Sequence, residues 1–424
     1  MNVLIIGSGG REHAFAWKIS QSSLCKKLVI APGNGGTQDL GLNIYVDPND
    51  FPSIKEICIE HNIDIIIVGP EDPLVNGIHD FFKSDDKLKE IIVIGPCIRG
   101  AKLEGSKEFA KEFMQKYNIP TARYKSFTID NIEQGMTYLE EISSPYVLKV
   151  DGLAAGKGVL ILDRLDEAKN ELREIIVNKK FGDAGSTVVV EEYLTGIELS
   201  VFVLTDGKSY KILPSAKDYK RVGENDTGLN TGGMGAISPV PFVDRFFMDK
   251  LDREIIIPTI KGLNSENILY QGFIFIGLMV SNGNAKVIEY NVRMGDPETE
   301  VVIPRIKSDL LNLLLGIGNG SFSEIDFDIS EKTAATVILT SGGYPEKYQT
   351  GYGISGIEDA DNSLVFHSGT KLNNKELITN GGRVLAVTSI ANSIEAAVKK
   401  SMESCNKIKF NQKYYRKDIG KDLL

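Results

Sequence analysis

The chain has 424 residues, a formal net charge of −9 and 42 glycines. At about 150 residues per domain, this length predicts about three domains. The acidic balance argues against a nucleic-acid binder, and no run approaches the roughly 18 apolar residues of a membrane-spanning helix. Four scattered cysteines show no zinc spacing and indicate reduced thiols. We therefore expect a cytoplasmic protein, and we expect it to be a monomer without nucleic-acid or membrane partners.

The first hundred residues repeat one pattern, in which a short β-branched run ends in small residues. Such runs are typical of parallel strands buried on both faces, and their alternation with amphipathic stretches predicts an open α/β sheet. Ligands of such sheets bind beyond the carboxyl ends of the strands, where every small-residue turn would lie. The runs are residues 3–6, 28–30, 65–68 and 91–94.

The rest of the chain mixes strands and helices. Ser106 is a plausible cap for a helix at 105–118. The last hundred residues are rich in short strands, and one amphipathic helix follows these strands. Strands are expected at 146–150, 159–162, 187–191, 273–280, 286–291, 335–340, 364–368 and 383–388. Further helices are expected at 165–178, 309–316 and 394–405.

A glycine loop at residues 7–10 follows the first strand. It resembles a dinucleotide fingerprint, but Glu12 stands at the last glycine position and no acid closes the second strand, so a nicotinamide site is disfavoured. Backbone N–H groups at a helix start, together with Arg11, suit a phosphate monoester. A tight turn without a ligand is the alternative.

A second glycine loop spans residues 151–159. It is not a Walker A loop, because only three residues separate its first two glycines and Gly158 follows Lys157. Glycines and a lysine between two strands predict a flap whose N–H groups fold over phosphates, and Lys149 adds a second positive charge. The alternative is a glycine-rich hairpin with a solvated lysine.

The run 287–293 predicts a strand with Glu289, Asn291 and Arg293 on one face and the apolar residues between them, Ile288 included, on the other. Carboxylate and amide oxygens suit Mg²⁺, and an arginine can grip a phosphoryl or carboxylate group with two hydrogen bonds. An edge strand with a wet face is the alternative.

The remaining charged segments are weak signals when taken singly. Glu191 and Glu192 follow a strand and must point to opposite faces, so only one can face a site. For the segment 218–221, taken alone, a solvated charged loop is the commoner explanation. The histidines show no metal spacing, and no Ser-His-Asp or Cys-His arrangement indicates a nucleophile.

The joint occurrence of these motifs is far more specific. Eleven strings occur in one order: GSGGREH (7–13), APGNGGT (31–37), VGPEDPLV (68–75), LEGSK (103–107), KVDGLAAGKGV (149–159), NTGGMGA (230–236), EYNVRMGDPET (289–299), GGYP (342–345), HSGTK (367–371), TNGGRVL (379–385) and YRKDIG (415–420). Over essentially the whole chain, the sequence resembles the phosphoribosylamine–glycine ligase family of the ATP-grasp superfamily.

The resemblance implies an α/β and α+β multidomain architecture. An N-terminal open parallel α/β domain (1–103) would precede an ATP-grasp module (104–326) with a mobile glycine-flap subdomain (about 121–190), and a small β-rich domain (327–424) would follow. The implied reaction joins glycine to 5-phosphoribosylamine with ATP and Mg²⁺ or Mn²⁺, through a glycyl phosphate, in purine biosynthesis.

The resemblance also assigns roles to residues. The ATP contacts would be Lys107, Lys149, Lys157, Glu191, Glu192, Leu194 and Glu198, the last holding the ribose hydroxyls. The metal ligands would be Glu289 and Asn291. The phosphoribosyl group would be held by Gly9, Gly10 and Arg11, with Glu71 nearby. Glycine and the reacting phosphate would be surrounded by Asp218, Lys220, Arg221, Asn230, Thr231, Arg293 and Asp296. The catalytic residues would be Arg293, Lys149, Lys157 and Asp296.

The chain also departs from the family pattern. The family usually reads QDHKR where Lys217 begins the segment, and DTGPNTGG where Leu229 precedes Asn230. We expect Lys217 to add charge beside the substrate loop and Tyr219 to remove a titrating group. Residues 273–280 carry no acid, so a second metal ion is left open. The alternatives are another ATP-grasp carboxylate–amine ligase or carboxylase, or a non-catalytic scaffold.

Overall fold

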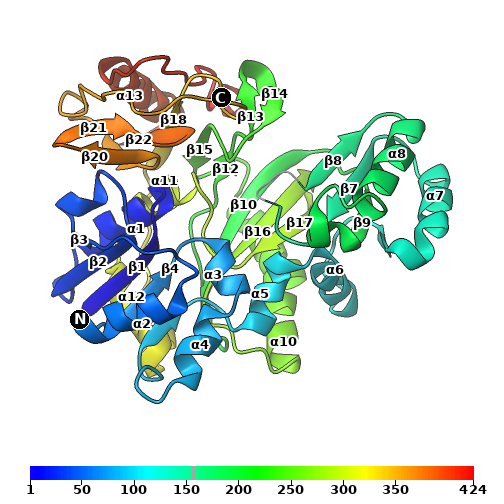
Figure 1. Ribbon diagram of the computed structural model, residues 1–424, viewed down its shortest axis with the longest axis horizontal. Helices are drawn as coiled ribbons and strands as arrows, with labels where there is room; N and C mark the ends of the chain where they lie inside the picture. The colour runs from blue at the N-terminus through cyan, green and yellow to red at the C-terminus, as the bar shows by residue number, and fades with distance from the viewer. Residues whose placement is uncertain (155–157) are drawn as a thin grey trace.

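The computed structural model describes residues 1–154 and 158–424 (Figure 1). The prediction for Lys157 therefore lies outside the described residues. Among the described residues no helix combines the length and apolar character that crossing a membrane requires.

The N-terminal part is an open parallel sheet with strand order β3-β2-β1-β4-β5, which confirms the predicted α/β sheet. Alternate residues of β1 enter two separate cores, so both faces of the sheet are covered. The two-residue β3 was not predicted, because it has no apolar run. The elements are β1 (Asn2–Gly7), α1 (Gly10–Ile19), β2 (Lys27–Pro32), β3 (Leu42–Asn43), α2 (Phe51–Glu60), β4 (Ile65–Val68), α3 (Glu71–Val75), α4 (Ile78–Ser84), β5 (Ile92–Ile94) and α5 (Ile98–Gly105).

The helix predicted at 105–118 is wrong at its start, because α5 runs to Gly105 and a new helix begins at Lys107. Ser106 separates the two helices and caps the second: its hydroxyl accepts a hydrogen bond from the Phe109 amide at 3.1 Å. The second helix is α6 (Lys107–Lys116).

A small antiparallel sheet with order β6-β9-β7-β8 follows, and it projects to the right in Figure 1. Two helices pack on it around a separate apolar core that includes Leu139, Leu148 and Leu172. We call this unit the lid. Its elements are β6 (Tyr124–Phe127), α7 (Ile132–Glu141), β7 (Tyr146–Val150), β8 (Val159–Leu162), α8 (Leu165–Ile176) and β9 (Val188–Glu192).

A second antiparallel sheet, of order β11-β10-β16-β17, lies at the centre of Figure 1 and shares both cores with the N-terminal sheet. Its elements and the helices around it are β10 (Ile197–Thr205), β11 (Tyr210–Ile212), α9 (Arg245–Leu251), α10 (Ile257–Ser265), β16 (Gly272–Ser281), β17 (Asn284–Asn291), α11 (Thr299–Val302) and α12 (Leu310–Asn319).

The predicted alternation along 287–293 is wrong at Ile288 and holds from Glu289 onward, where Tyr290 and Val292 are in the core. Gly277 pairs with Glu289 and the next residue of β16 pairs with Val287, so Ile288 is the extra residue of a β-bulge. The bulge reverses the side-chain alternation: Val287 and Tyr290 both enter the core, whereas Ile288 lines the same cleft as Glu289. The strand ends at Asn291, before Arg293.

The C-terminal part is β-rich, as predicted, with an antiparallel sheet of order β12-β15-β18-β22-β19 covered by a helix. Two of its strands come from residues 217–238, so cutting the chain at residue 326 does not separate the sheets. The elements are β12 (Lys217–Asp218), β13 (Arg221–Gly223), β14 (Thr227–Asn230), β15 (Gly235–Ser238), β18 (Thr333–Thr340), β19 (Leu364–His367), β20 (Thr370–Asn373), β21 (Glu376–Thr379), β22 (Arg383–Ala391) and α13 (Ile394–Lys407).

Candidate active site

A narrow cleft on the central sheet places Lys220 beside two acids, Glu198 and Glu289. Residues from β10, β16 and β17 line it together with Lys220. Burial alone would raise the pKa of Glu289, but Lys220, Lys149, Lys107 and Arg293 together lower it below its usual value. Glu289 is therefore a charged carboxylate at neutral pH, facing three lysines from three different segments and also Arg293. We call Glu289, Lys107, Lys149 and Lys220 the lysine cluster.

Lys149 reaches this cluster from the lid through a buried ion network. Its Nζ lies 3.0 Å from Glu191 Oε1 and donates to the Ile288 carbonyl at 3.1 Å. The other oxygen of Glu191 lies 3.0 Å from Lys111 Nζ, and these three charged side chains are no more than 6% exposed. Such a network fixes Lys149 because none of its members can move into water without separating the charges.

Lys111 was not predicted as a site residue. It lies on the buried side of α6 with Ala110 and Met114, and burial lowers the pKa of its ammonium group to about 8 against the opposing charge of Glu191. A lysine among the core positions of an amphipathic helix was the signal that could have found it.

The acids at the end of β9 lie on opposite faces, as the alternation predicted. Glu191 is buried in the network, whereas Glu192 faces outward and pairs with Arg123 at 2.8 Å and with Lys286 at 2.8 Å. These pairs lower the pKa of Glu192 to about 2, although partial burial opposes the shift. Leu194 follows as a partly buried residue outside the strand.

Lys107 lies at the base of the second glycine loop. Its Nζ donates to the carbonyl of Gly152 at 3.2 Å, and burial lowers the pKa of its ammonium group although Glu289 and Asp151 raise it. Asp151 also accepts the backbone N–H of Glu108 at 2.8 Å, so the start of α6 and the loop are tied together.

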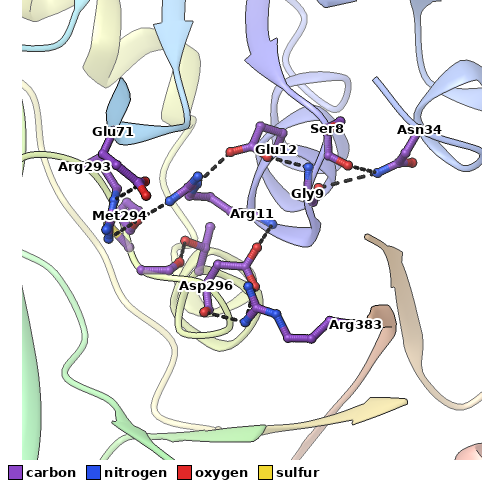
Figure 2. Close-up of polar contacts among 12 residues, drawn as sticks. Ser8, Gly9, Arg11, Glu12, Asn34, Glu71, Arg293, Met294, Asp296 and Arg383 are labelled. Atoms are coloured by element: carbon purple, nitrogen blue, oxygen red, sulfur yellow. Dashed lines mark hydrogen bonds and ion pairs between the residues drawn. The ribbon is translucent and has the colours of Figure 1, made fainter. Parts of the chain in front are cut away.

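A second charged group lies at the start of α1 (Figure 2). Arg11 donates through Nε to Glu12 at 2.6 Å and through Nη1 to the Met294 carbonyl at 3.0 Å, and its backbone N–H donates to Asp296 at 3.4 Å. Burial lowers the pKa of Arg11, but Glu12 and Glu71 together raise it above the usual value. Arg11 is thus a buried, permanently charged group with part of its donor set already engaged.

Arg293 joins the two groups. Its guanidinium donates to Glu71 at 3.3 Å, to Glu104 at 2.6 Å and to the Asn291 side-chain oxygen at 3.1 Å. Burial raises the pKa of Glu104 although Arg293 opposes the shift. Glu104 was not predicted, and its position just before the Ser106 cap gave no sign of this contact.

The C-terminal sheet adds Arg383, which was also missed. Figure 2 shows it reaching Asp296: its Nη1 lies 3.0 Å from Asp296 Oδ1, 2.7 Å from the Asp296 carbonyl and 2.6 Å from the Gly232 carbonyl. Asn34 makes a similar link by donating to the carbonyls of Ser8 and His367 at 2.9 and 2.7 Å. Both residues lie in strings that the family resemblance had already marked.

Acids gather around Lys220 on the other side of the lysine cluster. Lys220 pairs with Glu198, and burial raises the pKa of the neighbouring Asp218. Burial and the charge of Asp218 raise the pKa of Glu298 to about 7, and Glu298 accepts a hydrogen bond from Ser200 at 3.1 Å. Lys220 therefore faces several carboxyl groups. Positive and negative groups side by side suit a small zwitterion, which carries one charge of each sign.

The predicted glycine-binding segment divides into two parts. Thr231 donates to the Lys220 carbonyl at 2.8 Å and so stays with the lysine cluster. Arg221 instead donates to the Gly228 carbonyl at 2.9 Å, within the β13–β14 hairpin, where it pairs with the exposed Asn230. The structure therefore does not bring Arg221 and Asn230 to the acids around Lys220.

The expectation that Lys217 adds charge beside the substrate loop is wrong. Lys217 and Tyr219 point away from Asp218 and Lys220, and both contact Asp422, at 2.7 Å and 2.6 Å. The Lys217 ammonium lies 4.0 Å from the centre of the Tyr219 ring, a cation–π contact. The alternation along this strand accounts for the result, because neighbouring residues face opposite sides. Leu229 is half exposed in the hairpin.

The predicted metal ligands fit an oxygen-coordinated cation. Glu289 is ionised, and the buried side-chain oxygen of Asn291 accepts from Arg293 at 3.1 Å, which leaves its second lone pair for a cation. Magnesium is commonly held by one or two protein oxygens together with substrate phosphates, so two ligands suffice. No group of three or more His, Cys, Asp or Glu side chains within residues 1–154 and 158–424 is arranged to hold a metal.

Solved structures of low sequence identity share the fold. A biotin carboxylase from Campylobacter jejuni matches with a TM-score of 0.72 at 15% identity, covering 97% of this chain and 92% of that one. Residues 105–299 match the family model described as phosphoribosylglycinamide synthetase, ATP-grasp (A) domain. The fold and the lysine cluster thus define a member of the ATP-grasp class.

The N-domain model of the same family matches residues 1–104 and its C-domain model matches residues 334–422. A phosphoribosylamine–glycine ligase from Fusobacterium nucleatum is 45% identical over 99% of this chain and 98% of its own length. A solved phosphoribosylamine–glycine ligase from Thermotoga maritima matches with a TM-score of 0.86 at 34% identity, covering 99% and 100% of the two chains. The chain belongs to the phosphoribosylglycinamide synthetase family, which confirms the resemblance.

One relative is longer. The bifunctional purine biosynthetic protein PUR2,5 of Pichia angusta is 46% identical over 99% of this chain, but the match spans only 53% of that relative.

Proposed function

We propose that the protein ligates glycine to 5-phosphoribosylamine, forming glycinamide ribonucleotide, ADP and phosphate. The observation that carries the proposal is the position of Arg293, which connects Asn291, beside the lysine cluster, with Glu71, beside the start of α1. A nucleotide site and a sugar-phosphate site that share one charged residue fit a reaction in which a phosphorylated acid meets a phosphoribosyl amine.

The nucleotide would occupy the lysine cluster. Phosphoryl transfer requires mainly position and positive charge, which Lys107 and Lys149 would supply together with Lys157 of the glycine flap. Both carboxylate oxygens of Glu191 are engaged by lysines, so the segment from Glu191 through Glu192 to Leu194 would meet the adenine through its backbone. Glu198 would accept the ribose hydroxyls.

Glu289 and Asn291 would hold Mg²⁺ or Mn²⁺. When bound, such an ion neutralises charge on the nucleotide phosphates. Asn291 would also keep Arg293 in place, since the amide oxygen accepts from its guanidinium.

The phosphoribosyl group would lie against Gly9, Gly10 and Arg11, with Glu71 nearby. The backbone N–H groups at the start of α1 and the fixed charge of Arg11 favour a phosphate there. Because Arg11 already donates to Glu12 and Met294, it would bind through its remaining donors.

Glycine would bind between the two groups. Asp218 would accept its ammonium group, Lys220 and Arg293 would attract its carboxylate, and Thr231 would hold the Lys220 segment. Asp296 would face the reacting amine. Arg221 and Asn230 would contribute only if the β13–β14 hairpin turned toward the site.

In the first step a carboxylate oxygen of glycine attacks the γ-phosphorus of ATP and ADP leaves. In the second, the amine nitrogen attacks the carbonyl carbon of the glycyl phosphate, the carbon–oxygen bond breaks, and the nitrogen loses a proton. A free amine is a competent nucleophile toward an acyl phosphate, so the proposal needs no strong protein base. We propose in addition that the enzyme is cytoplasmic and monomeric.

An ADP-release assay tests the proposal, with glycine and phosphoribosylamine omitted in turn and bicarbonate supplied as a competing acid. We expect ADP only when both substrates are present. ADP formation with bicarbonate in place of glycine would instead favour a carboxylase. A Glu289→Ala preparation, purified in parallel, serves as the control for contaminating ATPase.

A further inference from the structure

Glu300 is a fully buried acid beside the site, and the function proposed above gives it no role. It lies in α11 with an exposed fraction of 0%, and neither of its carboxyl oxygens has a hydrogen-bond donor among the described residues. An unpaired, dry carboxylate is costly, so its surroundings need an explanation.

The turn that begins α1 lies against this carboxyl: a methyl group added at Gly10 would lie 2.3 Å from Glu300 Oε1 and 2.7 Å from the Ser368 hydroxyl. Only glycine lets the turn approach so closely. The carboxyl of Asp296 lies against the neighbouring residue of the same turn, because a methyl group added at Gly9 would lie 3.0 Å from Asp296 Oδ2. Glu300 therefore lies directly beneath the proposed phosphate turn.

Two charged carboxylates cannot share a dry site, so one of them keeps a proton. Asp296 has both a cationic partner and an N–H partner. Arg383 Nη1 lies 3.0 Å from Asp296 Oδ1, and the backbone N–H of Arg11 donates to Asp296 Oδ2. Within residues 1–154 and 158–424 no group donates a hydrogen bond to the Glu300 carboxyl, and Arg383 acts on it only through its charge. Burial, together with the charge of Asp296, raises the pKa of Glu300 well above its usual value, whereas Arg383 and Arg11 help to lower that of Asp296.

We propose that Glu300 is a positioning residue whose protonated carboxyl donates a hydrogen bond to Asp296 and supports the Gly9–Gly10 turn from below. In this arrangement Asp296 stays ionised between Arg11 and Arg383, and the turn keeps the shape that receives the sugar phosphate (Figure 2). This inference rests on the proposed function, because it takes the turn as the phosphoribosyl site.

Loss of the donor should affect one substrate more than the other. Without the hydrogen bond, Asp296 and the backbone N–H of Arg11 lose their fixed positions, whereas the lysine cluster is not touched. The KM for phosphoribosylamine should therefore rise while the KM for ATP stays close to the wild-type value.

The test compares Glu300→Gln, which keeps a donor but cannot ionise, with Glu300→Leu, which has a similar size and no donor. Binding of ribose 5-phosphate to the full chain is measured by calorimetry, alongside the two KM values. We expect the Gln variant to bind within about twofold of wild type and the Leu variant to bind about tenfold more weakly, which corresponds to one lost hydrogen bond. Equal binding by wild type and Leu, or equal weakening by Gln and Leu, would overturn the inference.

Infrared spectroscopy gives a readout that does not depend on turnover or on the folding of the Leu variant. At mildly alkaline pH, where Glu298 with a pKa of about 7 is ionised, wild type should show the carbonyl stretch of a protonated carboxyl that Glu300→Gln lacks. The absence of that difference would overturn the protonated state.

If the proposed function is wrong, the binding and infrared measurements give a different pair of results. If the wild-type chain bound no ribose 5-phosphate, the phosphate site and the positioning role would both be overturned, while the infrared band would still report on Glu300 itself.

Discussion

Replacement of Lys111 by methionine tests whether the buried network fixes the nucleotide lysine. Lys111 is 2% exposed and lies 3.0 Å from a carboxylate, Glu191, that is 3% exposed. Removing one partner of a buried ion pair costs about 3–5 kcal/mol of unfolding free energy. Glu191 keeps its contact with Lys149, also at 3.0 Å, so we expect the lower end of that range, about 3 kcal/mol.

The matched control is Lys116→Met, the same change on the same helix. Lys116 is 63% exposed and pairs with Glu266 at the surface, so its replacement should have much less effect. Urea unfolding followed by circular dichroism measures the stability of both variants. The KM for ATP should rise in Lys111→Met, because Lys149 loses its fixed position, and should stay unchanged in Lys116→Met. Equal stability and equal KM for the two variants would refute the reasoning.

Three further predictions concern single residues. Glu289→Ala should abolish turnover, because the metal ion that neutralises the nucleotide phosphates loses its carboxylate ligand. Near-normal ADP release at millimolar magnesium would contradict this assignment. Arg11→Ala should raise the KM for phosphoribosylamine and leave that for ATP unchanged, so an equal rise in both would count against its phosphate role. Glu192 has a pKa of about 2 instead of the usual 4.5, so its charge stabilises the fold above pH 4.5 and ceases to do so as pH falls toward 2. The stability difference between wild type and Glu192→Gln in urea unfolding should therefore shrink below pH 4.5, and a constant difference would refute it.

Much of the fold could be predicted because its strands follow simple patterns. The runs at 65–68 and 146–150 are buried strands with those bounds, since mainly apolar or β-branched residues suit buried strands. The run at 159–162 is also a strand with its predicted bounds, although it is only partly buried. The bulge at Ile288 could not be predicted, because an extra residue in a strand depends on its neighbour and leaves no periodic signal. Likewise, the strands contributed by residues 217–238 to the C-terminal sheet depend on contacts distant in sequence.

The candidate site was predicted best where a motif carries the chemistry itself. Lys149 could be singled out because it lies beside a glycine loop, and Glu289 because strand alternation puts it on the face of Asn291; the structure brings the two together. Arg383 and Glu104 contact segments far along the chain, at Asp296 and Gly232 and at Arg293, and no local pattern predicts such contacts. Lys217 was misplaced for a related reason: its partner, Asp422, lies near the other end of the chain.

The central claim is that glycine is activated by phosphorylation of its carboxylate and then captured by phosphoribosylamine. Glycine labelled with ¹⁸O in its carboxylate tests this most directly, by mass spectrometry of the inorganic phosphate released in a complete reaction. One labelled oxygen should pass from each glycine to each phosphate, because the carbon–oxygen bond of the glycyl phosphate breaks when the amine attacks. Phosphate that carries no label while glycinamide ribonucleotide accumulates would contradict the account.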